Sequence, residues 1–194
     1  MLGILVELQR LKRLDRTGWS LRGLPSGTES VAAHSFGVTT IAMLLADELV
    51  SSGVNINIEQ VLRMSLLHDW AEARVGDLPK TATFYFGLEA RKRAESMAFR
   101  DIVKHLKNRE LYQSLYRNYE ERTGLEARIV KAADVIDLLV QVLALERVGA
   151  RGLDEFWEVA QNPDFQLEDK AGELIASILQ SLLEQRKRIV GQSS

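Results

Sequence analysis

The chain has 194 residues, of which 46% are hydrophobic, and its 25 basic and 27 acidic residues give a net charge of −2. This length and composition can bury one sizeable core, which excludes collagen-like, disordered and mini-protein classes. The near-balanced charge predicts no general attraction to nucleic acid or to an anionic membrane, and the lack of cysteine excludes disulfides and thiolate metal sites.

Only three prolines and 13 glycines interrupt the chain, so long stretches without helix breakers predict an all-α protein. Leucines at positions 2, 5, 8 and 11 mark the first helical stripe. The segments at 15–28 and 76–87, which contain glycine and proline, are predicted as loops. Periodicity and breakers together predict helices at about 2–14, 30–50, 57–75, 88–107, 110–122, 125–148, 153–161 and 167–190.

The helix at 125–148 should be the most buried, because residues 135–143 at its centre are apolar on nearly all sides. No repeat or long linker divides the chain, so a single domain over 1–194 is expected. No apolar run approaches ~18 residues, and basic residues follow rather than precede the apolar N-terminus. We therefore expect no membrane span, no signal peptide and a cytoplasmic location.

Four potential metal ligands lie on three of these predicted helices: His34, His68, Asp69 and Asp134. Each has apolar neighbours, and a buried carboxylate is unfavourable unless a cation compensates it. Two imidazoles and two carboxylates suit a borderline divalent transition ion. Taken singly, each histidine is more often a packed or surface residue, and Lys131 is an alternative partner for Asp134 three residues later.

The joint pattern resembles the 5′-deoxynucleotidase (YfbR-like and HDDC-like) branch of the HD-domain metal-dependent phosphohydrolases. The resemblance covers roughly residues 5–150. It implies an HD-type helical bundle of roughly six to eight helices, with helices in 153–190 packing on the core. The motifs that carry it are Arg16-Thr17-Gly18-Trp19, Glu29-Ser30-Val31-Ala32-Ala33-His34-Ser35, His68-Asp69-Trp70-Ala71-Glu72 and Gly76-Asp77-Leu78-Pro79.

The resemblance also implies roles for individual residues. The metal ligands would be His34, His68, Asp69 and Asp134. Glu72 would hold or deprotonate the attacking water or protonate the leaving oxygen, and Asp77 would orient that water. Arg16 would bind the phosphate and Trp19 would pack against the sugar.

Two further points concern these residues. Glu72 follows His68 by four residues, which predicts the same helical face one turn on. In the bacterial branch the arginine and tryptophan are adjacent, whereas Thr17 and Gly18 separate Arg16 from Trp19 here. This difference leaves the sugar selectivity open.

The predicted activity is release of phosphate from nucleoside 5′-monophosphates, favouring 2′-deoxyribonucleotides, by a homodimer. The predicted cofactor is one divalent transition ion per chain, Co²⁺ or Mn²⁺ before Fe²⁺, Ni²⁺, Zn²⁺ or Mg²⁺. The remaining histidine, His105, has no acidic neighbour, so one metal is favoured over two. The alternatives are an HD hydrolase of another phosphorylated metabolite or of a nucleoside triphosphate, and a non-catalytic helical dimerisation module.

Overall fold

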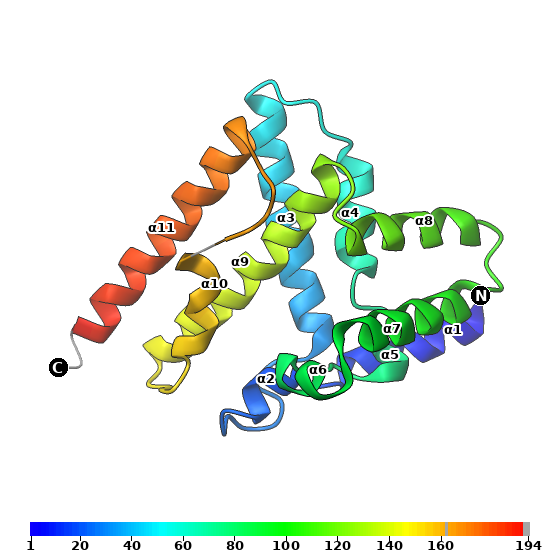
Figure 1. Ribbon diagram of the computed structural model, residues 1–194, viewed down its shortest axis with the longest axis horizontal. Coiled ribbons are helices and arrows are strands. Elements are labelled where there is room, and N and C mark those ends of the chain that lie inside the picture. The colour runs from blue at the N-terminus through cyan, green and yellow to red at the C-terminus, as the bar shows by residue number, and fades with distance from the viewer. Residues whose placement is uncertain (162, 192–194) are drawn as a thin grey trace. The chain divides into compact units, whose positions relative to one another are not determined.

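A computed structural model describes residues 1–161 and 163–191. Every regular element in this part of the chain is a helix (Figure 1), and an isolated antiparallel bridge joins Asp15 to Ser30. The predicted all-α class is confirmed, and eight of the described α-helices have seven residues or more. Residues 162 and 192–194, which the predicted single domain includes, lie outside the described residues.

The chain separates into two compact units, one of residues 1–36 and 66–121 and the other of residues 37–65 and 122–194. The single domain expected over 1–194 stays a prediction. The division falls within two helices, so α3 (Val31–Ser51) and α4 (Ile58–Leu67) each supply residues to both units.

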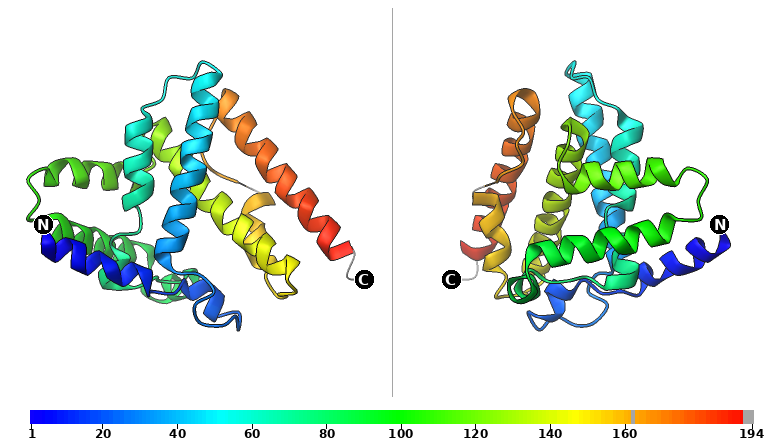
Figure 2. Two further views of the ribbon diagram at one scale, coloured as in Figure 1. Left: turned by 180° about the vertical axis from the view of Figure 1, so that it is seen from behind. Right: turned by 45° about the vertical axis from the view of Figure 1, so that its right-hand side comes forward.

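The first unit is built around stacked aromatic rings. Phe99 and Tyr116 stack with their ring centroids 4.1 Å apart, and Trp70 lies 6.3 Å from Phe99. Phe99 belongs to α7 (Leu88–Val103) and Tyr116 to α8 (Arg109–Glu120), so this stacking joins two helices that pack together (Figures 1 and 2). The helices that belong wholly to this unit are α1 (Leu2–Leu8), η1 (Gln9–Lys12), α2 (Thr17–Ser20), α5 (Glu72–Val75), α6 (Lys80–Phe86), α7 and α8.

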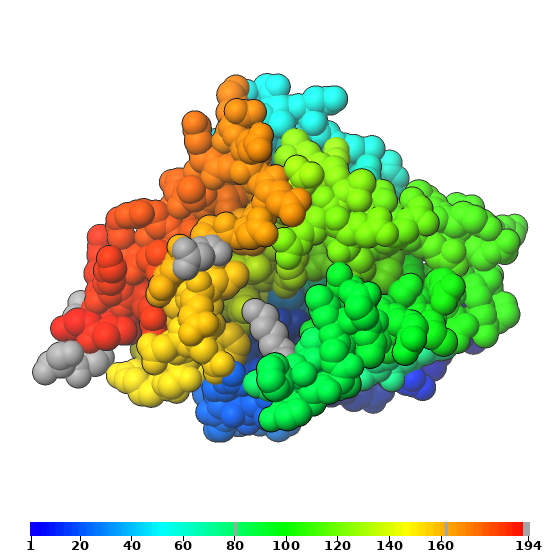
Figure 3. Space-filling view, in the orientation of Figure 1, coloured from blue at the N-terminus to red at the C-terminus, as the bar shows by residue number. Residues whose placement is uncertain are grey.

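The second unit is organised by α9 (Leu125–Arg147), which packs along α11 (Asp169–Gly191) (Figure 2). Eleven of the 23 residues of α9 are buried, which agrees with the prediction of a buried helix. The connection between them contains η2 (Asp154–Trp157) and α10 (Glu158–Gln161). The outer side of α11 lies at the surface (Figure 3).

The predicted helix at 57–75 is interrupted in the structure. Residues 68–71 form a turn between α4 and α5, in which the N–H of Trp70 donates to the Leu67 carbonyl and the N–H of Glu72 donates to the Asp69 carbonyl. These bonds span three residues rather than four, so the chain is wound more tightly here. Glu72 is therefore not one α-helical turn after His68, and that part of the prediction is wrong.

Other boundaries also differ from the sequence prediction. The first helix ends at Leu8 and continues as the 3₁₀-helix η1, and the predicted loops at 15–28 and 76–87 contain α2 and α6. Both loop helices are short, at four and seven residues, and glycines flank them or lie within them. Because glycine is counted as a helix breaker, a short helix that contains or adjoins one is not predicted from the sequence.

Among the described helices, α3 has the length and composition of a membrane span, with a mean hydropathy of 1.2 over 18 residues. This helix is not the uninterrupted apolar run that the sequence analysis looked for, because it contains polar residues such as His34, Thr39 and Asp47. Core helices of water-soluble proteins can have the same length and hydropathy. Val31, Val38 and Ala42 of α3 are fully buried inside the protein.

Candidate functional site

Three of the four predicted metal ligands converge in the first unit. His34 lies in the first turn of α3, and His68 and Asp69 lie in the turn after α4. The two imidazole rings meet edge to face with their centroids 5.5 Å apart. The Oδ2 atom of Asp69 lies 3.2 Å from Nε2 of His68 and 3.7 Å from Nε2 of His34. Both histidines are almost fully buried.

This group has the donor chemistry of a divalent metal site. One ring nitrogen of His34 lies within 4.8 Å of one ring nitrogen of His68, so a single ion can reach both. Burial would raise the pKa of Asp69, but His68, His34 and Arg16 together hold it well below its usual value. Asp69 is therefore an ionised oxygen donor beside two nitrogen donors, a set that suits a transition ion.

The fourth predicted ligand, Asp134, lies on α9 in the second unit. Nζ of Lys131 lies 2.6 Å from its Oδ2 atom, so the alternative partner noted in the sequence does contact it. The role of Asp134 as a ligand stays a prediction.

Glu72 begins the four-residue helix α5 and is buried. Its Oε2 atom is inaccessible to solvent and accepts no hydrogen bond from the residues that the structure describes. Burial raises the pKa of Glu72 well above its usual value, and the carboxylates of Asp69 and Asp77 raise it further. The side chain therefore keeps its proton to higher pH than an ordinary glutamate, and the protonated form is the one a proton donor needs.

Asp77 lies in the connection between α5 and α6 and is held by one residue from far away in the sequence. The backbone N–H of Thr17 donates to Oδ2 of Asp77 at 2.5 Å. The Thr17 hydroxyl donates to the backbone carbonyl of Asp77 at 2.7 Å. Nothing in the sequence singles out Thr17 beyond its place between Arg16 and Trp19.

Arg16 reaches the metal-ligand group directly. Its Nη1 atom lies 3.4 Å from Oδ2 of Asp69, and its side chain is 17% exposed. Trp19 is 1% exposed, and its indole N–H donates to Oε2 of Glu29 at 2.7 Å. The structure thus brings Arg16 to the site, whereas it buries the indole whose contact with a sugar stays a prediction.

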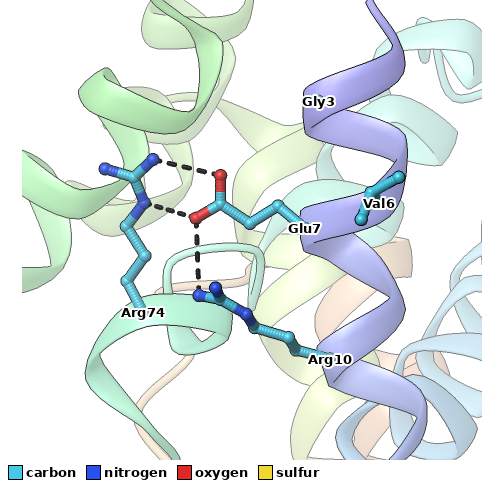
Figure 4. Close-up of a pocket in the computed structure, with 5 residues that line it drawn as sticks. All are labelled: Gly3, Val6, Glu7, Arg10 and Arg74. Carbon is cyan, nitrogen blue, oxygen red and sulfur yellow. Dashed lines mark hydrogen bonds and ion pairs between the residues drawn. The ribbon is translucent and has the colours of Figure 1, made fainter.

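Two ion pairs that involve α7 and α5 were not predicted from the sequence. On α7, Nε of Arg91 donates to Oε1 of the buried Glu95 at 2.7 Å. Arg74 of α5 makes a forked pair with Glu7 of α1, with Nη2 lying 3.0 Å from Oε2 (Figure 4). The i,i+4 spacing of Arg91 and Glu95 is common on charged helices, and Glu7 and Arg74 lie 67 residues apart, so the sequence singles out neither pair.

Figure 4 also shows Arg10 beside this pair, at one side of a pocket of about 510 Å³. Nη1 of Arg10 donates to the Ala73 carbonyl of α5 at 3.2 Å. Side chains of α1 and η1 therefore hold α5 at two points, and α5 carries Glu72.

An all-helical fold with two buried imidazoles beside an ionised aspartate and a buried glutamic acid is typical of helical metal-dependent hydrolases. The chain belongs to the HD domain family, whose sequence profile matches residues 8–164. This confirms the family that the motifs predicted.

Individual relatives agree with the family. The chain is 28% identical to the 5′-deoxynucleotidase HDDC2 of Danio rerio over 191 residues, which cover 97% of this chain and 88% of that protein. It is 32% identical to the 5′-deoxynucleotidase hdd1 of Schizosaccharomyces pombe over 157 residues, covering 77% of this chain and 75% of that one. A solved structure of a conserved hypothetical protein from Pyrococcus furiosus matches with a TM-score of 0.83 and 33% identity, over 95% and 99% of the two chains.

Proposed function

We propose that this protein is a metal-dependent 5′-deoxynucleotidase that hydrolyses nucleoside 5′-monophosphates, with preference for 2′-deoxyribonucleotides, to the nucleoside and inorganic phosphate. The observation that carries the proposal is the convergence of His34, His68 and Asp69 beside the buried Glu72. The relatives named 5′-deoxynucleotidase, which match over most of the chain, supply the substrate class.

The proposed metal ligands are His34, His68, Asp69 and Asp134. Asp134 is included because of the sequence pattern and the family resemblance. Two nitrogen and two oxygen donors suit one transition ion per chain, with Co²⁺ or Mn²⁺ favoured. When bound, such an ion supplies Lewis-acid chemistry at a phosphoryl oxygen and at water.

The phosphate binds through Arg16, whose planar guanidinium can donate two parallel hydrogen bonds to a phosphate dianion. Asp69 already holds this guanidinium beside the ligand group at 3.4 Å. Asp77 accepts a hydrogen bond from the attacking water and orients its oxygen toward phosphorus. As the bond from phosphorus to the 5′-oxygen breaks, Glu72 gives its proton to that oxygen, consistent with its raised pKa.

Trp19 limits the space at the 2′ position of the sugar in this proposal. Because the indole is 1% exposed, direct packing against a sugar requires the Trp19 side chain to become more accessible when the substrate binds. The proposed homodimer and cytoplasmic location come from the family resemblance and the composition. Light scattering of the purified protein and cell fractionation test them.

The deciding experiment measures phosphate release from matched deoxy- and ribonucleoside 5′-monophosphates, a nucleoside triphosphate and a sugar phosphate, with each metal added in turn. We expect kcat/KM for dAMP to exceed that for AMP by about 5–150-fold, the cost of burying an unpaired hydroxyl. Turnover confined to the triphosphate or the sugar phosphate would instead support a different HD hydrolase. A fully metal-loaded protein without any turnover would support a non-catalytic module.

A further inference from the structure

Thr17 is the residue that ties Asp77 to the rest of the site. It uses both of its hydrogen-bond donors on this one aspartate, the backbone N–H at 2.5 Å from Oδ2 and the hydroxyl at 2.7 Å from the carbonyl oxygen. The carboxylate and the backbone of Asp77 are therefore held by the same residue, 60 positions earlier in the chain.

Thr17 is itself held in place by its neighbours. The N–H of Arg16 donates to the Glu29 carbonyl at 3.0 Å, and the indole of the buried Trp19 donates to the side chain of the same glutamate at 2.7 Å. Because Arg16 and Trp19 are both hydrogen-bonded to Glu29, Thr17 between them has little conformational freedom. The arginine immediately before Thr17 contacts Asp69, so two consecutive residues contact a predicted metal ligand and the predicted water-orienting residue.

Asp77 needs such support because no regular element fixes it. It follows Gly76, whose φ of 78° lies in the left-handed region, and it precedes the Pro79 that caps α6. An aspartate in such a connection can adopt several side-chain rotamers. Fixing Oδ2 on an N–H and the backbone carbonyl on a hydroxyl selects one of them and thereby fixes the direction of Oδ1.

We propose that Thr17 is a positioning residue that holds Asp77 in the orientation required for hydrolysis. This inference rests on the proposed function of the site. A displacement of about 1 Å in a reacting group can cost roughly 100-fold in rate, so the effect of Thr17 should appear in kcat. Of the two residues that separate Arg16 from Trp19, Thr17 supplies the contact to Asp77.

The two donors can be removed separately. Thr17→Val removes the hydroxyl and keeps the N–H, whereas Thr17→Pro removes both. Proline is tolerated at this position because Thr17 is the first residue of α2 and Arg16 before it is extended, with φ −66° and ψ 111°. Thr17→Ser keeps both donors. Thr28→Val is the matched control, because the Thr28 hydroxyl donates to the Pro25 carbonyl at 2.6 Å in the same loop.

We expect Thr17→Val to lower kcat for dAMP about 2–10-fold and Thr17→Pro about 10–100-fold, with KM changed less than about 2-fold. Thr17→Ser and Thr28→Val should stay within about 2-fold of the wild type. In an Asp77→Ala background, Thr17→Pro should lower kcat by less than about 2-fold more, because its effect passes through Asp77. A full additional loss in that background, or a serine variant no better than valine, would overturn the proposal.

Amide hydrogen exchange tests the contact without any turnover. In the wild type the Asp77 carboxylate protects the Thr17 N–H, so Asp77→Ala should accelerate its exchange by at least about 10-fold. An unchanged exchange rate overturns the positioning role, even in an active enzyme. If the wild type releases no phosphate from any nucleotide while the exchange rate rises, the proposed function fails and the contact stands.

Discussion

Glu7 and Arg74 lie 67 residues apart in the chain and form a forked ion pair that ties α1 to α5 (Figure 4). Arg74 lies two residues after Glu72, within the same four-residue helix. A helix of one turn has too few internal hydrogen bonds to be stable alone. The position of Glu72 therefore depends on this pair and on the bond from Arg10 to the Ala73 carbonyl.

The first prediction concerns this ion pair and pH. The hydrogen bond from Arg74 lowers the pKa of Glu7 below its usual 4.5. A carboxyl with a lowered folded pKa stabilises the fold above its unfolded pKa, and that contribution is lost as the pH falls through the folded value. Glu7→Gln should cost about 1 kcal/mol of unfolding free energy at pH 7 and reduce the loss of stability below about pH 4.5.

Urea unfolding as a function of pH measures both effects. Glu59→Gln is the matched control, because Glu59 pairs with Arg63 on an exposed face of α4. That variant should lose no more than about 0.5 kcal/mol. A Glu7 variant indistinguishable from this control would show that the forked pair does not hold α5.

The second prediction concerns the metal. His68→Ala and Asp69→Ala should each abolish metal binding and phosphate release together, because each removes one of four proposed protein ligands. Elemental analysis of the purified variants measures the metal, and His105→Ala, which changes an exposed histidine, serves as the control. Full metal content with normal turnover in either site variant would contradict the ligand assignment. A chelator should also lower the melting temperature of the wild type, since metal binding contributes to folding stability.

Glu72 should behave differently from the ligands. Glu72→Gln should retain the metal and lose about 10²–10⁴-fold in turnover, the range for loss of a proton-transfer group. Loss of the metal from this variant would instead make Glu72 a ligand.

The raised pKa of Glu72 also predicts a pH dependence for the metal-free protein. A carboxyl with a raised folded pKa favours the fold in its protonated form, and this stability is lost as the pH rises through the folded pKa. Glutamine does not ionise, so the stability of Glu72→Gln relative to wild type should grow as the pH rises above about 4.5. Unfolding curves in chelator measure this difference.

Another prediction follows from a close approach within the second unit. A Cβ atom at Gly37 of α3 would lie 1.9 Å from Oδ1 of Asp137 on α9. Gly→Ala inside a helix normally gains about 0.5–1 kcal/mol, but this clash should cost about 1–3 kcal/mol and dominate. Gly37→Ala should therefore be destabilised, whereas Gly3→Ala on α1, with no atom within 4 Å of its Cβ, should not. Adding Asp137→Ala should recover part of the loss, and unfolding in urea provides the measurement.

The motifs predicted the family. Three predicted ligands, which the structure brings together, were singled out because polar residues in apolar surroundings are conspicuous. His34, His68 and Asp69 each interrupt an apolar stretch, and burial without compensation would be unfavourable. The turn at 68–71 could not be predicted in this way. Ala71 and Glu72 are good helix formers, so local propensity favours a continuous helix and only the tertiary structure ends it.

The contacts of Thr17 and the burial of Trp19 could not be predicted from the sequence either. Both residues lie in the four-residue helix α2, in a segment where no periodicity shows which way a side chain points. Thr17 donates to Asp77, which lies 60 residues later in the chain, and Trp19 donates to Glu29, ten residues later. The expectation of an indole facing the sugar came from the family resemblance, which carries residue types rather than side-chain exposure.

The last prediction concerns the sugar. Trp19→Ala would remove a fully buried indole at a cost of about 3–5 kcal/mol, so Trp19→Phe and Glu29→Leu are better probes. Both lose the hydrogen bond that holds the indole and keep a packed ring. If Trp19 limits the space at the 2′ position, both should reduce the ratio of kcat/KM for dAMP over AMP, mainly by improving AMP. Arg16→Ala should weaken both substrates alike, since the phosphate is common to them. An unchanged ratio in both Trp19 and Glu29 variants would contradict the role of Trp19 and leave the phosphohydrolase activity unaffected.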